Sequence, residues 1–500
     1  MRLVADRAEL PEALASARRE ALQAFGSDVL LLERALLRPR HVEIQVVADQ
    51  YGRFLYLGER DCSIQRRHQK VIEEAPAPGV SPALRRRMGE TAVSLAQAIG
   101  YHNVGTVEFL LDENGAFYFL EMNTRLQVEH PVTEMVTGID LVAWQIAIAE
   151  GRPLPLEQAD LKLDGHAVEA RIYAENPAAG FLPVTGRIAW WQAPTGEGVR
   201  VDTGVQSGDV VTIHYDPMLA KIVAHGPDRE TAVRRLCRAL EQTVLLGLTT
   251  NIPFLRAVLQ HEAFVAGQVD TGFLPTCFAG WQDTQAGWQL AITAVTLAQW
   301  LSAPQLPENS GYWRNNPNPL PPFHYHVAGN EEKITTILEP VRFTANQFRL
   351  TFSKEPDRQL DAQLIEYTGT KMVLVVDGVQ QTVWLATEND RWWVHTSDGV
   401  VTLTAIPRLP VPHSSADVGG SLRAPMPGSV LAVLVEVGQR VQKGQPLMKL
   451  EAMKMEHTIR TAADGVVEAI FYAPGDTVEA DAQLLRIRTL AEEDDGNISA

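Results

Sequence analysis

A repeat near the end of the chain constrains its fold more than any other feature. Gly428 opens a Gly-Ser-Val run and Gly465 opens a Gly-Val-Val run, 37 residues apart. The same offset relates three further pairs, which are Gly438 with Gly475, Val441 with Val478, and Leu447 with Leu484. Repeated units of this kind bury their apolar faces against one another. The repeat therefore predicts two similar halves of short strands in a pseudo-symmetric β structure.

A lysine between two methionines lies between the two halves. Residues 451–457 (EAMKMEH) must make the crossover, so Lys454 is expected near a hairpin tip. One interpretation is a surface lysine in a turn beside two core methionines. The junction of the repeat favours a functional lysine instead. An exposed lysine on a rigid turn suits a cofactor on a long arm, because tethering gives the cofactor a high effective concentration at each site that it reaches.

This C-terminal region resembles biotin carboxyl carrier domains over residues 422–488. The resemblance rests on the motif around Lys454 and on residues 424–428 (APMPG). It implies an all-β biotinyl domain of the lipoyl-like hammerhead fold, with biotin attached to Lys454 by a biotin protein ligase. Lipoyl domains share this fold but lack methionines on both sides of the lysine.

A predicted hairpin upstream brings carboxylates together. Residues 104–111 and 116–122 are expected to form strands, and residues 112–115 (DENG) have the composition of the turn between them. This pairing can place Glu108 alongside Glu121. The flanking runs VEFL and FYFL are typical of buried strands, which argues against the alternative of a solvated polar face on an edge strand.

Alternate residues of a strand share one face, so Glu121 and Asn123 should project together. An extended continuation would add Arg125, Gln127 and Glu129 to that face. Two carboxylates and an amide oxygen are hard ligands that suit magnesium held with nucleotide phosphates.

Three stretches of the first 280 residues resemble biotin carboxylases of the ATP-grasp class. They are residues 119–131 (FLEMNTRLQVEHP), the basic run at 58–76 (GERDCSIQRRHQKVIEEAP) and residues 165–171 (GHAVEAR). The basic run taken alone would be interpreted as a solvated loop. The resemblance implies a magnesium or manganese site at Glu108, Glu121 and Asn123. It also implies ATP-binding residues, which are Glu33, Arg34, Leu36, His41, Gln65 and His68.

The same resemblance implies a mechanism. Bicarbonate would be positioned by Lys70, Arg125, Gln127 and Val128, and Glu129 would deprotonate it as the general base. Magnesium would neutralise charge during phosphoryl transfer from ATP. Arg171 would stabilise the enolate of biotin, a developing oxyanion. The implied catalytic residues are therefore Glu129, Arg125, Arg171 and Lys70.

The resemblance to biotin carboxylases begins at Met1-Arg2, where the glycine-rich loop of that family ends. The backbone N–H groups of such a loop bind phosphates. The chain is therefore expected to be an N-terminally truncated subunit, or a gene model begun at an internal methionine. By itself it is expected to carboxylate biotin inefficiently.

The region between the carboxylase and the carrier has a different sequence pattern. Residues 286–301 form one strongly apolar helical stretch, and short alternating runs from His324 to Pro407 predict a small β-barrel or sandwich. This order resembles the domain that docks the carboxyltransferase β subunit in two-subunit acyl-CoA carboxylases. The alternative is a second, independent globular domain.

The predicted architecture is multidomain α+β. We expect an ATP-grasp portion at residues 1–165, a biotin carboxylase C-terminal domain at 166–280, a helix and β-barrel docking domain at 281–410, a linker at 411–421, the biotinyl domain at 422–488 and an acidic tail at 489–500. The motif around Lys454 is most similar to α subunits of 3-methylcrotonyl-CoA carboxylases. Geranyl-CoA, propionyl-CoA and acetyl-CoA carboxylases remain alternatives, since the β subunit should select the acyl-CoA. A hetero-oligomer of α and β subunits is implied.

Composition excludes several classes of protein. The net charge of −17 argues against a general binder of nucleic acids or anionic membranes, although a local basic pocket for phosphates stays compatible with it. Cys62, Cys237 and Cys277 are far apart, which argues against a disulfide framework or zinc site and fits a reducing compartment. That compartment would be the cytoplasm in a bacterium and the mitochondrial matrix in a eukaryote. No apolar run approaches the roughly 18 residues that span a bilayer.

Two other functions compete with biotin carboxylation. The chain could act only as a biotinylated carrier and docking module, in which case biotinylation would occur with no ATP hydrolysis. It could instead be another ATP-grasp ligase that forms an acyl phosphate on a different carboxylate, in which case ATP use would not depend on bicarbonate. The biotin motif argues against the second possibility.

Overall fold

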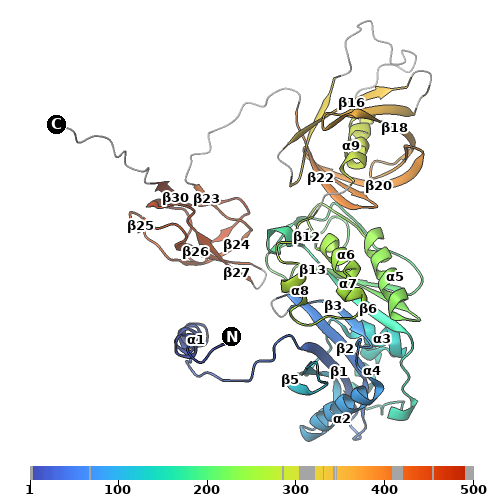
Figure 1. Cartoon of the computed structure of the whole chain (residues 1–500), viewed down its shortest axis with the longest axis vertical. Helices are drawn as coiled ribbons and strands as arrows, with labels where there is room; N and C mark the ends of the chain where they lie inside the picture. Colours follow the sequence, from blue (N-terminus) through green and yellow to red (C-terminus); the bar gives the residue numbers. More distant parts are fainter. Residues whose placement is uncertain are drawn as a thin grey trace, which may run out of the picture. The chain divides into compact units, whose positions relative to one another are not determined.

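The computed structural model (Figure 1) describes residues 4–66, 69–283, 287–302, 321–329, 332–341, 344, 346–407, 421–452 and 455–489. The chain divides into two compact units, one of residues 1–163 with 268–277 and one of residues 164–267 with 278–500.

An antiparallel sheet forms the centre of the first unit. Its strands are β1 (Arg40–Ala48), β2 (Phe54–Arg66), β3 (Gln69–Ala75), β4 (Asn103–Leu111) and β5 (Phe117–Asn123). They lie in the order β3-β2-β1-β4-β5. The predicted turn between β4 and β5 is confirmed, since the Asp112 carboxylate accepts hydrogen bonds from the backbone N–H groups of Asn114 and Ala116. Gly115 has the positive φ of 78° that this turn requires.

The two faces of this sheet differ in character because side chains alternate along each strand. Val42, Ile44 and Val46 of β1 face α2 (Pro82–Ala98) and pack with its residues Met88 and Ala92. The helix lies close to the sheet at Gly89, where a Cβ atom would come within 2.5 Å of the Tyr56 ring. The opposite face carries the polar residues of β1 and β4, and the candidate site lies there.

Four further helices belong to the first unit, namely α1 (Leu10–Phe25), α3 (His130–Thr137), α4 (Leu141–Ala149) and the short α8 (Phe273–Cys277). A 3₁₀ turn spans Gln158–Asp160. The apolar pattern of residues 131–150 is typical of one continuous helix, but the structure divides these residues between α3 and α4. Gly138 adopts φ 71° and ends α3, so two helices form with a bend of 96° between them. In the described part of the chain no single helix is long and apolar enough to cross a membrane, and α3 and α4 pass that test only when joined.

Two strands differ from what their composition suggests. The apolar run at residues 54–57 is only the start of β2, which extends to Arg66, so the run GERDCSIQR belongs to a buried strand and not to a solvated loop. The strand β5 is largely exposed, with Phe119 at 55%. It lies at the sheet edge beside β4 alone, so its apolar composition does not mean burial.

The second unit begins with a smaller α+β region. Its strands are β6 (His166–Tyr173), β7 (Glu175–Asn176), β8 (Leu182–Pro183), β9 (Gly186–Arg187), β10 (Trp190–Gln192), β11 (Val199–Thr203), β12 (Val210–Val211), β13 (Met218–Gly226) and β14 (Val244–Leu246). Its helices are α5 (Arg229–Gln242), α6 (Ile252–Gln260), α7 (Glu262–Val265) and a 3₁₀ turn at Pro177–Ala179. The strands β6, β13 and β11 pair antiparallel. Asp228 caps α5 by accepting from the Thr231 N–H, and Leu236 and Leu240 bury its apolar face.

A closed eight-stranded barrel follows. Its strands are β15 (Phe323–Val327), β16 (Lys333–Pro340), β17 (Gln347–Phe352), β18 (Glu355–Tyr367), β19 (Lys371–Val376), β20 (Val379–Glu388), β21 (Arg391–Thr396) and β22 (Gly399–Ala405). The helix α9 (Trp288–Ser302) lies inside the ring of strands (Figure 1), and residues 291–298 are all 0% exposed. The predictions of an apolar helix and of a small β-barrel are both confirmed. Residues 303–322, which follow α9 and are rich in Pro and Asn, lie almost entirely outside the described residues.

The last folded region is a pair of four-stranded sheets. Its strands are β23 (Ser421–Arg423), β24 (Gly428–Val433), β25 (Arg440–Val441), β26 (Pro446–Ala452), β27 (Met455–Arg460), β28 (Gly465–Ile470), β29 (Thr477–Val478) and β30 (Gln483–Thr489). Strands β24, β25 and β26 recur as β28, β29 and β30 with the 37-residue offset. The same correspondence relates the two sheets. Their strand orders are β23-β30-β28-β25 and β27-β26-β24-β29, so each strand of one sheet has its counterpart at the same place in the other. The predicted pseudo-symmetric fold is therefore confirmed.

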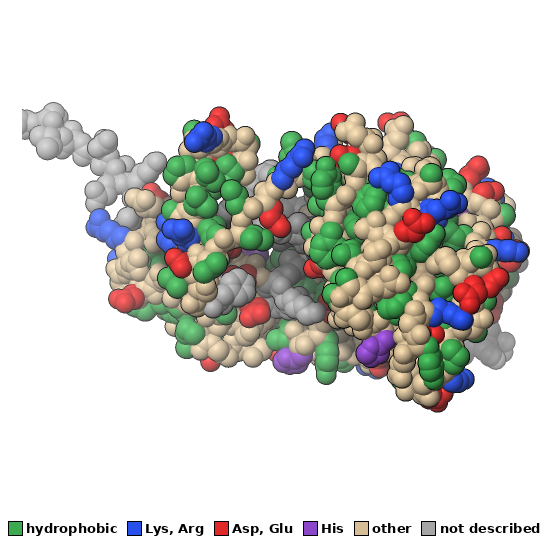
Figure 2. All heavy atoms as spheres, turned by 90° about the horizontal axis from the view of Figure 1, so that it is seen from below, with side chains coloured by type: hydrophobic (Ala, Val, Ile, Leu, Met, Phe, Trp, Pro, Cys, Tyr) green, Lys and Arg blue, Asp and Glu red, His purple; other side chains and the backbone are tan. Residues whose placement is uncertain are grey.

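One face of the molecule shows how its charged side chains are arranged. On the face shown in Figure 2, basic and acidic side chains are interspersed and do not gather by sign. The described residues on that face therefore form no patch of a single charge sign.

Candidate functional site

Lys70 is the centre of a buried charged cluster on the polar face of the first sheet. Its ammonium lies 2.6 Å from Glu43, 2.9 Å from Glu108 and 2.6 Å from Glu129. The three carboxylates are 0 to 5% exposed. Glu43 of β1 and Glu108 of β4 are direct cross-strand partners, which brings their side chains to the same face. The geometry thus concentrates three negative groups around a single amine.

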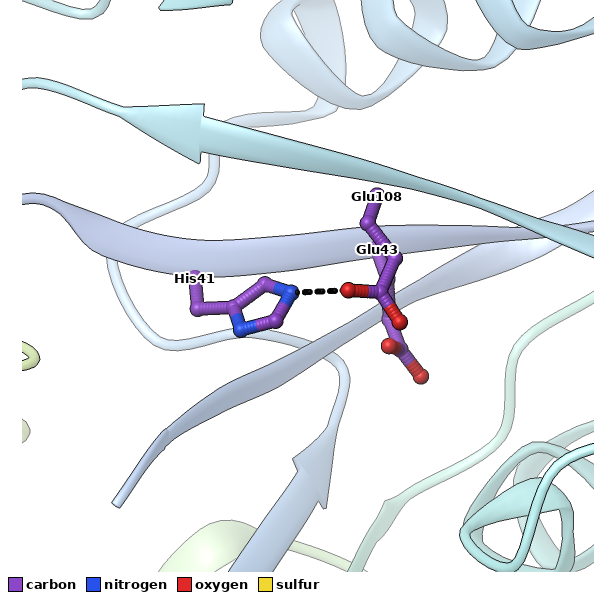
Figure 3. A group of neighbouring side chains, drawn as sticks. All are labelled: His41, Glu43 and Glu108. Carbon is purple, nitrogen blue, oxygen red and sulfur yellow. Dashed lines mark hydrogen bonds and ion pairs between the residues drawn. The ribbon is translucent and has the colours of Figure 1, made fainter. Parts of the chain in front are cut away.

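Glu108 accepts hydrogen bonds from four side chains. Its Oε1 receives Lys70, Asn123 Nδ2 at 2.9 Å and Gln127 Nε2 at 2.8 Å. Its Oε2 lies 2.7 Å from Nε2 of His41, and Figure 3 shows that bond together with Glu43. The cluster is therefore a continuous network and not a set of separate ion pairs.

The charges in this network shift the pKa values of its members. Burial raises the pKa of Glu43, but the charges of Lys70 and Arg60 outweigh it, so the pKa is lowered. Burial also raises the pKa of Glu108, but the hydrogen bond from His41 and the charge of Lys70 outweigh burial. They hold the pKa of Glu108 far below its usual range. Burial lowers the pKa of Lys70, but the surrounding carboxylates outweigh burial, so the pKa of Lys70 is raised. Both carboxylates are thus anionic and Lys70 is cationic at neutral pH.

His41 completes the charge balance. Burial lowers its pKa, but the hydrogen bond to Glu108 outweighs burial and raises the pKa above the usual 6.5. Burial likewise raises the pKa of the neighbouring Cys62 thiol, which stays protonated.

The predicted metal ligands are brought together. Asn123 contacts Glu108 and lies 3.3 Å from Glu121, its neighbour on β5. The donor set of two carboxylates and one amide fits a magnesium or manganese ion, provided that the Asn123 amide turns its oxygen inward. A second group, His41 with Glu43 and Glu108, offers ligand atoms within 4.8 Å of one another, but both of its carboxylates already pair with the Lys70 ammonium.

The loop after β5 delivers Gln127 and Glu129 in a way that the sequence did not predict. The strand ends at Asn123, so the expected extended continuation was wrong. Gln127 and Glu129 are nonetheless buried, at 5% and 2%, and both contact the cluster. Val128 is half-buried between them. Arg125 is exposed, and its Nη1 donates to the carbonyl of Leu126.

The predicted nucleotide-binding residues are only partly assembled. His41 belongs to the cluster, and Gln65 pairs with Lys70 across β2 and β3. Glu33 and Arg34 are exposed and Leu36 is half-buried, on a segment without regular secondary structure. Among the described residues no hydrogen bond joins these three to the cluster. His68 lies outside the described residues.

Arg171 belongs to the second unit. It lies on β6, is 8% exposed, and is the cross-strand partner of Lys221 on β13. Its backbone carbonyl accepts a hydrogen bond from Asn251. Lys221 in turn pairs with Asp202 at 3.4 Å, so the predicted arginine lies in a row of charged residues that crosses β6, β13 and β11.

Sequence reasoning missed two central residues, Glu43 and Arg60. Arg60 is 0% exposed and lies 2.6 Å from Glu43. A signal was present in residues 41–45 (HVEIQ), where His41, Glu43 and Gln45 alternate with apolar residues and so mark a polar face.

The candidate cofactor lysine lies between two described strands. The strands β26 and β27 pair antiparallel up to Ala452 opposite Met455. Lys454 lies outside the described residues. The strands before and after it are anchored in the core by residues such as Leu450 and Ile459.

Comparisons with known families agree with this geometry. Residues 1–157 match the model described as "Carbamoyl-phosphate synthase L chain, ATP binding domain", residues 169–276 match "Biotin carboxylase C-terminal domain" and residues 420–487 match "Biotin-requiring enzyme". The chain is 42% identical over 509 residues to the methylcrotonoyl-CoA carboxylase subunit alpha of Dictyostelium discoideum, with 96% of this chain and 71% of the relative covered. The chain belongs to the family of biotin-dependent carboxylase α subunits.

Other members of this α-subunit family give the same result. Methylcrotonoyl-CoA carboxylase subunit alpha of Rattus norvegicus is 39% identical, over 97% of this chain and 70% of that protein. The propionyl-CoA carboxylase alpha chain of Ruegeria pomeroyi is 38% identical, over 96% of this chain and 74% of that protein. The Dictyostelium and rat proteins are both described as mitochondrial.

Solved structures match the carboxylase part of this family member. The biotin carboxylase domain of a thermophilic 2-oxoglutarate carboxylase bound to bicarbonate has 43% identity and a TM-score of 0.54. It is matched over 56% of this chain and 63% of its own length, so the chain spans less than two thirds of that domain. Biotin carboxylase of Campylobacter jejuni, described as a beta-gamma-ATP complex, has 43% identity and a TM-score of 0.53. The match covers 55% of this chain and 61% of that structure. The predicted ATP-grasp and biotinyl folds are thus confirmed.

Proposed function

We propose that this chain carboxylates biotin on Lys454 with bicarbonate and ATP, as the α subunit of an acyl-CoA carboxylase. The observation that carries the proposal is the convergence of Lys70, Gln127 and Glu129 on one buried site. Lys70 bonds to Glu129 and to Glu108, and Gln127 bonds to the same Glu108. A cation, an amide and a carboxylate gathered in this way are the groups needed to hold a small anion and remove its proton. The proposal also rests on the bicarbonate and ATP complexes of the solved relatives.

Each residue has a role in this proposal. Lys70 and Gln127, with Arg125 and the Val128 backbone, would bind and orient bicarbonate, and Glu129 would accept its proton. Glu108, Glu121 and Asn123 would hold the divalent ion, which supplies charge neutralisation for phosphoryl transfer. His41, Gln65 and His68 with Glu33, Arg34 and Leu36 would bind the nucleotide. Arg171 would stabilise negative charge that develops on the biotin ring.

The remaining regions would serve transfer of the carboxyl group. In this proposal residues 1–165 and 166–280 form the carboxylase, residues 281–410 dock a carboxyltransferase β subunit, and residues 422–488 carry biotin added by a biotin protein ligase. A linker at 411–421 would let the carrier move between sites. The β subunit would bind the acyl-CoA in a hetero-oligomer. The assembly would lie in the cytoplasm of a bacterium or in the matrix of a mitochondrion.

The acyl substrate that we propose is 3-methylcrotonyl-CoA, because the methylcrotonoyl-CoA carboxylase α subunits of Dictyostelium and rat align over nearly the whole chain. Propionyl-CoA is the second candidate, since α chains of that enzyme align over a similar length. Reconstitution with each kind of β subunit, followed by acyl-CoA carboxylation, separates the two.

The decisive experiment is ATP hydrolysis by this chain in the presence and absence of bicarbonate, with free biotin as acceptor. We expect hydrolysis to require bicarbonate. Glu129→Gln should lower turnover by roughly 10²- to 10⁴-fold, the contribution typical of a general base. Lys454→Arg should keep hydrolysis with free biotin but should no longer take up biotin itself.

Two outcomes would contradict the proposal. Folded and biotinylated protein without any ATP hydrolysis would leave a carrier and docking module. Hydrolysis that is independent of bicarbonate would indicate an ATP-grasp ligase that uses a different carboxylate.

A further inference from the structure

Arg60 uses every donor of a fully buried guanidinium. Its Nε donates to Glu43 at 2.6 Å, and Nη1 donates to Gln45 at 2.7 Å and to Thr133 at 2.9 Å. Its Nη2 donates to Thr106 at 3.3 Å and to Gln127 at 3.1 Å. An arginine has five N–H donors, so no donor remains for a substrate. The role of Arg60 must therefore be exerted through its five acceptors.

Those acceptors come from four segments of the first unit. Glu43 and Gln45 are on β1, and Thr106 is on β4. Gln127 is in the loop after β5, and Thr133 is on α3. The last two flank Glu129 in the chain. The guanidinium thus fastens the segment on both sides of Glu129 to the centre of the sheet.

The bond to Gln127 also fixes the orientation of its amide. Gln127 Oε1 accepts from Arg60 while its Nε2 donates to Glu108 at 2.8 Å. With the oxygen held by Arg60, the N–H₂ group must face the carboxylate cluster. Glu43 is shared in the same way, since one oxygen binds Arg60 and the other binds Lys70.

We propose that Arg60 is a positioning residue that holds Gln127 and the Glu129 segment against Lys70, and so sets the affinity of the site for bicarbonate. This inference rests on the proposed function for its substrate. A purely structural role would be different, because Arg60 would then only neutralise Glu43 in the interior. The planar fork of arginine can bind several segments at once, whereas a lysine carries the same charge with three donors at one point.

The test is Arg60→Lys, which keeps the charge and removes the fork. We expect the KM for bicarbonate to rise about 10-fold or more, which is the usual effect of losing hydrogen bonds to a charged group. The KM for ATP should stay within about twofold of the value for the parent chain. Amide hydrogen exchange over residues 124–134 should accelerate by a similar factor. Exchange in α2, on the other face of the sheet, should not change.

A matched control is Arg85→Lys. Arg85 makes two hydrogen bonds to Glu59, the residue before Arg60 on β2, from the apolar face of the sheet. The substitution removes the same guanidinium fork without touching residues 124–134. It should leave both the KM for bicarbonate and exchange in that segment unchanged.

A milder variant covers the case in which Arg60→Lys does not fold. Thr133→Val removes one acceptor of Arg60 and should accelerate exchange at the start of α3 and raise the KM for bicarbonate. Thr137→Val on the same helix is its control, since that hydroxyl bonds only to the carbonyl of Thr133 within α3 and to a nearby backbone N–H. The double variant Arg60→Lys with Gln127→Ala should raise this KM by less than the product of the two single effects, because each single variant already removes the contact between Arg60 and Gln127.

Several results would overturn the inference. Loss of thermal stability in Arg60→Lys with an unchanged KM for bicarbonate would make Arg60 purely structural. Uniform acceleration of exchange across the whole first unit would do the same. If the parent chain shows no bicarbonate-dependent hydrolysis, the proposed function fails, but the exchange measurements still decide whether Arg60 fastens this segment.

Discussion

At the scale of single residues, the buried cluster is a problem of charge balance. Three buried carboxyl groups, those of Glu43, Glu108 and Glu129, surround Lys70, and Arg60 pairs with Glu43 from the other side. Burial lowers the pKa of His41, but the hydrogen bond to Glu108, 2.7 Å from its ring, outweighs burial and raises that pKa. A cluster this deeply buried is stable only while its charges stay paired, because an unpaired ion in the interior is costly.

The His41 pair makes stability depend on pH in a defined direction. Its pKa is raised in the folded state, so its contribution is complete below the unfolded value near 6.5 and is lost as pH rises through the folded value. We therefore expect the urea midpoint of the first unit to fall as pH increases above about 6.5. His41→Asn should remove this part of the pH dependence.

The control for this prediction is His102→Asn, since His102 is exposed and should leave the slope unchanged. Equal slopes in the parent chain and in His41→Asn would contradict the prediction.

At the scale of secondary-structure elements, the sequence could predict most strands but not the burial of all of them. The alternation in residues 41–48 predicts β1 correctly, because one face is apolar and the other is polar. The run GERDCSIQR in β2 has no such pattern, since Arg60, Asp61 and Ser63 are buried through pairing with other polar groups. Pairing partners distant in sequence leave no local signal, so this part of β2 looked like a loop and Arg60 was missed.

The carboxylate pair at Glu108 and Glu121 was predictable for the opposite reason. Its geometry follows from one short hairpin. The turn residues and the alternation along both strands lie within one short stretch of sequence, so they could be recognised there. The approach of Gln127 and Glu129 depends on a loop held by tertiary contacts, and strand periodicity described it incorrectly.

The helix α9 should dominate the stability of the barrel. Ile292 is 0% exposed in the core that the helix shares with the surrounding strands. Ile292→Ala should lower the free energy of unfolding by about 2–5 kcal/mol, the usual cost of a cavity in a closed core. Urea unfolding followed by tryptophan fluorescence measures this, since Trp288 and Trp392 pack against the same core.

Val379→Ala provides the comparison for Ile292→Ala. Val379 is 57% exposed on β20, so its truncation should change the free energy of unfolding by less than about 0.5 kcal/mol. Equal losses in the two variants would show that α9 does not support the barrel.

At the scale of the whole molecule, the chain consists of regions with their own cores. The biotinyl region has a core that includes Leu447, Leu450, Leu484 and Leu485, all at 0% exposure. Such a region meets the physical requirement for folding as a separate domain.

A fragment of residues 421–489 should therefore fold alone. We expect a single cooperative urea transition by circular dichroism and complete uptake of one biotin by mass spectrometry with a biotin protein ligase. Lys454→Arg should unfold at the same urea concentration without taking up biotin. A fragment that unfolds without a cooperative transition would show that the carrier depends on the rest of the chain.

The filled interior of the barrel limits what that region can do. Eight strands can enclose either packed side chains or one small ligand. Here residues 291–298 of α9 occupy the lumen with no exposed surface. Among the described residues, the barrel interior is therefore filled by α9 and the strand side chains packed on it, and we expect recognition by another protein to depend on the outer wall and the connecting loops. Substitutions that point inward should weaken folding, whereas those that affect assembly should map to the outside.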